Sequence, residues 1–220
     1  MNYQHSDVSG ALIDLPVGKV VCVGRNYADH AKELGNEVPK SPILFLKPAT
    51  SLVALGETLD YPKQHGSCHF ETEIAVLLKE DLTDASAAEV EQAIWGFALA
   101  LDLTLRDVQN ALKAKGHPWE RAKAFDGSCP ITSFVPKADL PNALKRAQYA
   151  LLVDDEPRQT GDTDKMLFAI LPLIAQMSSV FTLKAGDIIL TGTPAGVGPL
   201  ESGKKLDLLL EQFAWSTQTR

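Results

Sequence analysis

The chain has 220 residues, of which 45% are hydrophobic and 22% charged, a composition typical of an ordinary globular protein. Its formal net charge is −7 and its isoelectric point is about 5.2. This acidic balance argues against a surface that binds nucleic-acid phosphates or an anionic membrane, because both attract clustered Lys and Arg. We therefore expect neither a nucleic acid nor a membrane as a partner.

Nothing in the sequence indicates export or membrane insertion. No apolar run reaches the roughly 20 residues of a membrane-spanning helix, and the N-terminal MNYQHSDVSG lacks the basic and apolar regions of a signal peptide. The cysteines Cys22, Cys68 and Cys129 are odd in number, far apart and without a C-x-x-C pair. Reduced thiols in the cytoplasm are the simplest interpretation. Cys68 is either a packed residue or a ligand or nucleophile.

Short apolar runs bounded by Gly and Pro predict strands, and apolar residues at helical spacing predict helices. In chain order we expect a strand at residues 19–24, one to three helical turns within 27–39, strands at 42–48 and 73–78, a surface helix within 84–97, a strand at 96–105, a helix at 106–116, strands at 130–136 and 149–157, a helical segment at 162–181, and strands at 187–194 and 205–210. Pro172 should kink that last helical segment or start a second helix. Many short strands with few helices indicate a β-rich α+β fold.

Three carboxylates occur where the pattern predicts buried strands. Glu71 and Glu73 stand two positions apart in HFETEIAVLL, so on a strand they share one face, and Asp102 interrupts the apolar LALDLTL. Burying an unpaired carboxylate is very unfavourable, and like charges on one face repel. A divalent cation would remove both problems. Oxygen ligands without a nearby His or Cys cluster suit Mg²⁺ or Mn²⁺.

A purely structural interpretation of these carboxylates stays open. Glu71 and Glu73 would then be exposed at a strand edge, and Asp102 would cap the following helix, a role that Asp performs well. Spacing alone does not decide between a metal site and this alternative.

A histidine and a glutamate form a second candidate group. His30 and Glu33 are three residues apart, so on a helix they can touch. A carboxylate beside an imidazole fixes its tautomer and raises its basicity, which suits a general base. The same spacing also occurs in ordinary solvated surface pairs.

Three cations and one amide are candidates for binding an anion. Arg106 and Gln109 lie one and two helical turns beyond Asp102, Lys123 lies in RAKAFD, and Lys47 lies in FLKP. Each is an ordinary surface residue unless they converge near the carboxylates. There they would bind an anionic substrate or stabilise developing negative charge.

Six motifs in order resemble the fumarylacetoacetate hydrolase family, in particular its small members, the acylpyruvases and oxaloacetate decarboxylases. The motifs are VCVGRNYADHAKELG, PILFLKPATSLV, HFETEIAVLL, GFALALDLTLRDVQ, PWERAKAFDGSCPI and LTGTPAGVGPL. They extend from about Val20 to about Leu210, and the final EQFAWSTQTR matches no family feature.

The resemblance implies a mixed β-sandwich roll with a few flanking short helices. It also implies one catalytic domain over residues 1–220, with a short N-terminal extension at about 1–17, and a homodimer. The family's acidic triad falls on Glu71, Glu73 and Asp102, which would bind one Mg²⁺ or Mn²⁺ per subunit.

The resemblance also assigns roles to the other polar candidates. The catalytic His-Glu pair falls on His30 and Glu33, within a segment that acts as a mobile lid. Lys123 would act in catalysis, and the substrate-binding residues would be the following: Arg106, Gln109, Thr193 and, less directly, Lys47.

The implied activity is metal-dependent cleavage of a C–C bond in a small anionic 2-oxo acid. Hydrolysis of an acylpyruvate or fumarylpyruvate and decarboxylation of oxaloacetate both leave a pyruvate enolate. In hydrolysis, His30 assisted by Glu33 would take a proton from water. Two alternatives stay open: a 2-hydroxyhepta-2,4-diene-1,7-dioate isomerase or decarboxylase of aromatic catabolism, and a non-catalytic binding domain stabilised by metal.

Overall fold

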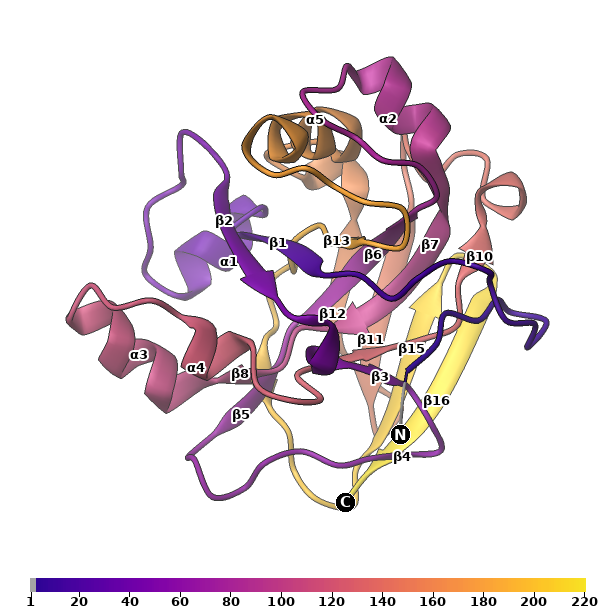
Figure 1. Cartoon of the computed structure of the whole chain (residues 1–220). Helices are drawn as coiled ribbons and strands as arrows, with labels where there is room; N and C mark the ends of the chain where they lie inside the picture. The colour runs from indigo at the N-terminus through magenta and orange to yellow at the C-terminus, as the bar shows by residue number, and fades with distance from the viewer. Residues whose placement is uncertain (1–2) are drawn as a thin grey trace.

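The structure is a computed structural model that describes residues 3–220 (Figure 1). The strands are β1 (Val20–Gly24), β2 (Ile43–Lys47), β3 (Leu52–Ala54), β4 (Thr58–Leu59), β5 (Cys68–Phe70), β6 (Thr72–Leu78), β7 (Ile94–Leu101), β8 (Thr104–Leu105), β9 (Cys129–Ile131), β10 (Val135–Pro136), β11 (Gln148–Val153), β12 (Glu156–Asp162), β13 (Ile188–Leu190), β14 (Gly198–Pro199), β15 (Lys205–Leu210) and β16 (Phe213–Thr219). The α-helices are α1 (Ala28–Glu33), α2 (Ala87–Ala93), α3 (Arg106–Ala114), α4 (Glu120–Lys123) and α5 (Ile170–Val180).

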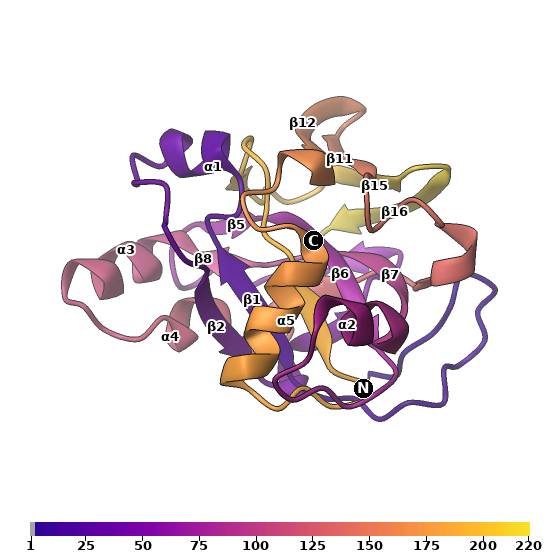
Figure 2. The same ribbon diagram turned by 90° about the horizontal axis from the view of Figure 1, so that it is seen from above.

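Within residues 3–220 the strands form three sheets. The largest has the order β2-β1-β13-β6-β7-β9-β3, with β10 also paired to β7. A second sheet has the order β12-β11-β15-β16-β4, and a small third one the order β14-β5-β8. Figures 1 and 2 show α2 and α5 packed together on one part of the large sheet, and α1, α3 and α4 gathered at another side. This strand-rich α+β architecture with few short helices confirms the predicted fold class.

The central strands of the large sheet are covered on both faces. In β6, Ile74, Val76 and Leu78 contact the larger hydrophobic cluster, whereas Ala75 and Leu77 contact the smaller one. Strand β7 alternates in the same way. Burial on both faces explains why these strands are nearly continuous apolar runs without the hydrophobic–polar alternation of a half-exposed strand.

Two of the helices are shorter than the sequence pattern predicted. Helix α2 begins at a capping box formed by Ser86 and Glu89 and ends at Ala93, after which the chain continues as β7. Pro172 lies in the first turn of α5, where a missing N–H is tolerated, so it causes no kink. A separate 3-10 turn at Thr163–Lys165 precedes it and residues 166–169 are not helical, which confirms the other predicted possibility, that Pro172 starts a second helix. Among the helices of residues 3–220, none is long and apolar enough to cross a membrane.

The predicted strands are present, but sequence analysis missed several others. Strand β16 occupies most of EQFAWSTQTR and pairs with β15 on one side and β4 on the other. Its pattern is half polar, because Ser216, Thr217 and Gln218 follow Trp215, so the sequence alone does not indicate a strand there. Pairing between strands supplies the stability that the local pattern does not indicate.

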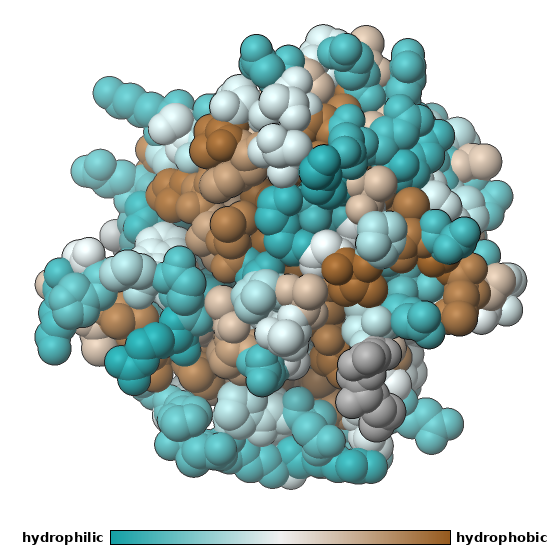
Figure 3. Space-filling view, in the orientation of Figure 1, coloured by the Kyte–Doolittle hydropathy of each residue, from teal (hydrophilic) through white to brown (hydrophobic). Residues whose placement is uncertain are grey.

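One edge of the large sheet carries apolar residues that are only half-buried. Strand β2 is the edge strand, and its residues Ile43, Leu44, Phe45 and Leu46 are neither fully buried nor fully exposed. Figure 3 shows hydrophobic side chains gathered on the face over this strand.

The segment before β1 packs against the smaller hydrophobic cluster through Ile13, Leu15 and Val17. His5 is buried beneath it, with its ring Nε2 near the carbonyl oxygens of Pro16 at 3.1 Å and Gly186 at 3.2 Å. This segment therefore covers one face of the central strands.

Replacing Gly186 tests this packing. Gly186 has φ +89°, and an added Cβ would lie 1.8 Å from the Pro16 carbonyl oxygen. We expect Gly186→Ala to lower the free energy of unfolding by about 3 kcal/mol, because a left-handed backbone cost of about 1 kcal/mol adds to a steric clash. Chemical denaturation measures this change.

Gly10→Ala is the matched control, since Gly10 has φ +85° but no atom within 4 Å of an added Cβ. It should lose only the backbone part, about 1 kcal/mol. Equal losses in the two variants would contradict close packing of residues 13–17 at Gly186.

Candidate active site

The pairing of β6 with β7 brings the three carboxylates together. Glu73 lies opposite Ala100, and at the end of this ladder the Asp102 N–H donates to the Glu71 carbonyl at 2.8 Å. Residues two apart share a face, so all three side chains point to the face that carries the smaller hydrophobic cluster. One oxygen from each carboxylate lies within 4.8 Å of the others.

The purely structural alternative for these carboxylates is wrong. Glu71, Glu73 and Asp102 are 6%, 2% and 1% exposed, so the glutamates do not lie at an exposed edge. Asp102 does not cap α3, whose N-cap is Leu105. Glu71 itself lies in the break between β5 and β6, where the chain changes from the small sheet to the large one.

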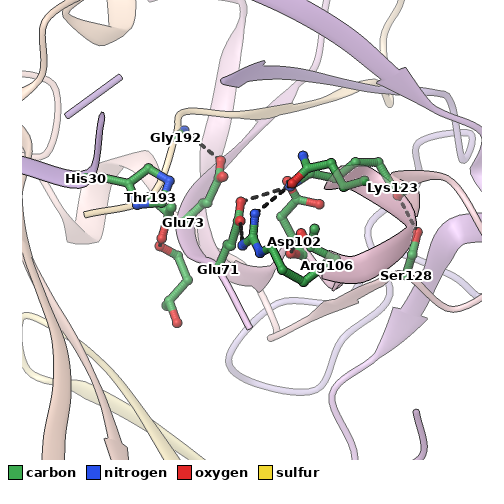
Figure 4. Close-up of polar contacts among 12 residues, drawn as sticks. His30, Glu71, Glu73, Asp102, Arg106, Lys123, Ser128, Gly192 and Thr193 are labelled. Atoms are coloured by element: carbon green, nitrogen blue, oxygen red, sulfur yellow. Dashed lines mark hydrogen bonds and ion pairs between the residues drawn. The ribbon is translucent and has the colours of Figure 1, made fainter. Parts of the chain in front are cut away.

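Two cations neutralise the carboxylate at this break (Figure 4). The Lys123 ammonium donates to Glu71 Oε2 at 2.8 Å and to Asp102 Oδ2 at 2.6 Å, and Arg106 donates to Glu71 Oε1. Burial alone would raise the pKa of Glu71, but attraction from Lys123 and Arg106 holds it below its usual range. The contacts of Lys123 with Asp102 and Glu71 raise the pKa of its ammonium despite its burial, so Lys123 stays charged.

Glu73 has a different environment from Glu71. Its Oε2 accepts a hydrogen bond from the Gly192 N–H at 2.6 Å, and the described residues provide no cation paired with it. Burial and repulsion by Asp102 raise the pKa of Glu73 well above its usual value. The negative charge of the cluster is therefore least compensated at Glu73.

Lys47 lies behind Asp102, away from the pocket wall. It is 0% exposed, its Nζ lies 2.8 Å from Asp102 Oδ1, and it donates to the Ser128 carbonyl at 3.1 Å and to the Lys123 carbonyl. This geometry fits a lysine that fixes the Asp102 carboxylate and the loop after α4. Direct contact between Lys47 and a substrate stays an untested prediction.

His30 and Glu33 meet on the short helix α1 as predicted. His30 Nδ1 lies 3.3 Å from Glu33 Oε2, and the His30 ring is buried in the same pocket as the carboxylates. The Gly196 N–H donates to Glu33 Oε1 at 3.0 Å, which holds the end of α1 against the loop after β13. Helix α1 is thus docked over the site, and its action as a mobile lid stays a prediction.

The remaining predicted residues also line this pocket. Arg106 Nη1 donates to Gln109 Oε1 at 2.6 Å. The Thr193 hydroxyl donates to the Thr72 carbonyl at 2.9 Å and accepts from Gln159 Nε2 at 2.7 Å. Its side chain is therefore held in place by both neighbours.

The residues of this pocket that sequence analysis missed include Arg25, Asn36, Lys113 and Trp119. Lys113 had a detectable signal, because it follows Arg106 by seven residues and Gln109 by four and so shares their helix face. Arg25 and Asn36 are loop residues without any such pattern.

Cys68 is a packed residue. It is 2% exposed within the larger hydrophobic cluster, and burial raises the pKa of its thiol to about 11. A protonated thiol is a poor ligand and a poor nucleophile.

The carboxylate cluster fits a divalent cation. All its donors are oxygens, they converge within one small pocket, and the Lys47 contact with Asp102 Oδ1 lacks hydrogen-bond geometry. The uncompensated charge at Glu73 adds to this fit. A hard ion such as Mg²⁺ or Mn²⁺ prefers such donors.

Comparisons with known proteins agree with this site. The family described as fumarylacetoacetate (FAA) hydrolase C-terminal matches residues 19–216. Oxaloacetate tautomerase YcgM of Escherichia coli (strain K12) is 51% identical over 216 residues, which cover 98% of this chain and 99% of that protein.

Two solved structures show the same fold. A fumarylpyruvate hydrolase from Pseudomonas aeruginosa, in complex with Mn²⁺ and pyruvate, has a TM-score of 0.91 and 34% identity, covering 99% of this chain and 95% of that one. A 2-hydroxyhepta-2,4-diene-1,7-dioate isomerase from Mycobacterium marinum has a TM-score of 0.78 and 32% identity, covering 93% and 75%.

The chain therefore belongs to the fumarylacetoacetate hydrolase family, as the order of the six motifs predicted. It is an enzyme of that family, and the alternative of a non-catalytic binding domain is wrong.

Metal binding can be separated from the role of His30. We expect Glu73→Gln to weaken Mn²⁺ binding at least tenfold, because it removes the charge that is least compensated by protein cations. His30→Ala should leave Mn²⁺ affinity unchanged. Titration calorimetry on EDTA-treated protein measures both, and a collapse of affinity in His30→Ala would contradict the assignment.

The buried lysine predicts a loss of stability. Lys47→Met leaves Asp102 without one of its two cations and removes one of the two donors of the Lys123 and Ser128 carbonyls, so the free energy of unfolding should fall by about 3 kcal/mol or more. Urea denaturation measures the fall. Lys184→Met is the control, since its ion pair with Asp81 is exposed and should matter little. Similar small effects in both variants would contradict the structural role of Lys47.

Proposed function

We propose that this enzyme catalyses the keto–enol tautomerisation of oxaloacetate or a closely related 2-oxo acid, with one Mg²⁺ or Mn²⁺ per subunit. The observation that carries the proposal is the meeting of three buried carboxylates and the His30–Glu33 pair in one pocket. The likeness to the E. coli oxaloacetate tautomerase supports oxaloacetate as the substrate.

Glu71, Glu73 and Asp102 would hold the cation. When bound, it supplies a Lewis acid that polarises the keto oxygen of a 2-oxo acid and so makes the neighbouring carbon acidic. The likeness of this chain to a fumarylpyruvate hydrolase whose structure contains Mn²⁺ supports this cofactor.

Positively charged side chains would bind and orient the substrate. Arg106 has a buried Nε without a hydrogen-bond partner within residues 3–220, and its guanidinium faces the carboxylate cluster. Together with the Lys123 ammonium it places fixed positive charge where an enolate oxygen develops. Gln109, held by Arg106, and Thr193 would complete the polar wall.

His30 would move the proton. With Nδ1–H donating to Glu33, Nε2 is free to take the C3 proton of the keto form and deliver it to the enolate oxygen, and in the reverse direction to take the enol O–H proton and deliver it to C3. Glu33 stabilises the imidazolium that forms. Because His30 is buried while α1 is docked, proton exchange would occur away from bulk water.

Cleavage of a C–C bond is the second candidate, and the fumarylpyruvate hydrolase structure with pyruvate favours it. Oxaloacetate decarboxylation breaks the C3–C4 bond and leaves a pyruvate enolate, which the same cations would stabilise. In acylpyruvate hydrolysis, His30 would instead take a proton from the attacking water. One site can serve these reactions because each passes through an enolate.

Three further expectations remain proposals. The chain forms one domain over residues 1–220, it is a homodimer, and it acts in the cytoplasm. The 2-hydroxyhepta-2,4-diene-1,7-dioate isomerase activity of aromatic catabolism is an outcome that the following test distinguishes.

The test follows two signals from oxaloacetate and Mg²⁺: loss of enol absorbance and release of pyruvate, coupled to lactate dehydrogenase. We expect EDTA-sensitive enol loss that is faster than pyruvate release. His30→Ala should slow enol loss by 100-fold or more, because a positioned general base contributes about 10²–10⁴.

Acetylpyruvate and fumarylpyruvate are assayed in parallel for pyruvate. EDTA-sensitive pyruvate from either one, without enhanced oxaloacetate tautomerisation, would replace the first candidate by the second. No change in any signal would reject both and favour the isomerase.

A further inference from the structure

We propose that the outer end of the active-site pocket is a second anion site, formed by Arg25 and Lys113, that binds a distal carboxylate of the substrate. The preferred substrates would then be dicarboxylic 2-oxo acids. This inference rests on the proposed function, because it assumes that the first carboxylate and the keto group occupy the end with Glu71, Glu73 and Asp102.

One face of helix α3 connects the two ends of the pocket. Arg106, Gln109 and Lys113 follow the spacing i, i+3, i+7, and all three line the pocket. Arg106 contacts Glu71 at the inner end. Lys113 lies seven residues further on, about 10 Å along the helix axis. A substrate whose first carboxylate lies near Arg106 would therefore point its other end toward Lys113.

The cations at the inner end of the pocket are paired with carboxylates, whereas those at the outer end are not paired with any in the described part of the chain. Arg106 pairs with Glu71, and Lys123 pairs with Glu71 and Asp102. Across residues 3–220, neither Arg25 nor Lys113 forms an ion pair with a carboxylate. Both are nonetheless half-buried in the pocket wall.

Lys113 and Arg25 lie close enough to repel each other. Burial, followed by repulsion from Arg25 and Arg106, lowers the pKa of Lys113. The one polar partner of Lys113 Nζ among the described residues is Asn36 Oδ1, at 3.3 Å. Two cations that converge on a partly buried space without a counter-ion form a site for an anion.

The backbone fixes Arg25 in this position. Arg25 has φ +61°, a left-handed conformation that costs a non-glycine residue about 1 kcal/mol or more. The next residue, Asn26, is fully buried, donates to the carbonyls of Phe168 and Thr191, and accepts from the Phe168 N–H. Such strain persists where surrounding contacts hold it, and it concentrates at functional sites.

Aromatic rings form the neighbouring wall. Phe45 and Trp119 both line the pocket, and their ring centroids are 5.9 Å apart. Apolar walls exclude water and so strengthen the attraction between a bound carboxylate and the two cations.

Equilibrium binding tests the proposal with a matched pair of ligands. 2-Oxoglutarate and 2-oxovalerate differ only in a terminal carboxylate against a methyl group, and both resist spontaneous decarboxylation. We expect the Mg²⁺-loaded protein to bind 2-oxoglutarate at least tenfold more tightly in titration calorimetry, because a charge-assisted contact contributes about that much. Lys113→Met should reduce this preference to less than threefold without changing the affinity for 2-oxovalerate.

Two variants serve as controls. Lys113→Arg keeps the charge and should retain the preference. Lys115→Met removes an exposed lysine just beyond the same helix and should leave both affinities unchanged. Arg25→Met is an independent second variant of the anion site and should behave as Lys113→Met does.

The outcomes separate this inference from the proposed function. If neither 2-oxoglutarate nor 2-oxovalerate binds in a Mg²⁺-dependent way, the proposed function fails and this inference fails with it. If both ligands bind with equal affinity to the unmodified protein, the second anion site is rejected while the metal site stands. A preference that survives in the Arg25→Met, Lys113→Met double variant also rejects it, and Lys113 then only tethers Asn36.

Discussion

The structure depends on the burial of three carboxylates where β6 begins and β7 ends. Their positions follow from strand register, which places Glu71 and Asp102 opposite each other and Glu73 two residues further along the same face. Such a cluster is tolerated only with compensating positive charge. Lys123 and Arg106 face it from the pocket, and Lys47 faces it from behind.

This electrostatic requirement links segments that are distant in the chain. Lys47 ends β2, and its ammonium binds carbonyl oxygens of Lys123 and Ser128, so the first edge of the sheet is joined to the loop after α4. On the other side, Gly192 after β13 donates to Glu73. The site is therefore part of the fold's own charge balance, and the cation it fits would complete that balance.

Much of the fold and the site could be predicted from the sequence, for identifiable reasons. Apolar runs such as β6 and β7 are recognisable because these strands are buried on both faces. Carboxylates are unfavourable in such runs, which is why Glu71, Glu73 and Asp102 could be identified as candidate site residues. Residues whose role depends on register between distant strands could not be predicted. Lys47 resembles a surface charge in FLKP, and only its pairing opposite Val20 places it beneath Asp102. Likewise, the position of the Arg25 backbone in the pocket wall depends on buried contacts of Asn26 with residues far along the chain.

The proton-transfer pair and the carboxylates belong to separate parts of the chain. His30 and Glu33 are both on α1, which is attached to the loop after β13 through the Gly196 N–H, whereas the carboxylates lie on or next to β6 and β7 of the large sheet. Under the proposed function, a 2-oxo acid would be held by side chains around the sheet, whereas its proton would be exchanged with a side chain of α1. Substrate binding and proton transfer would thus depend on two different segments, so a change in the contact between Glu33 and the Gly196 N–H could alter proton transfer without changing the carboxylate cluster.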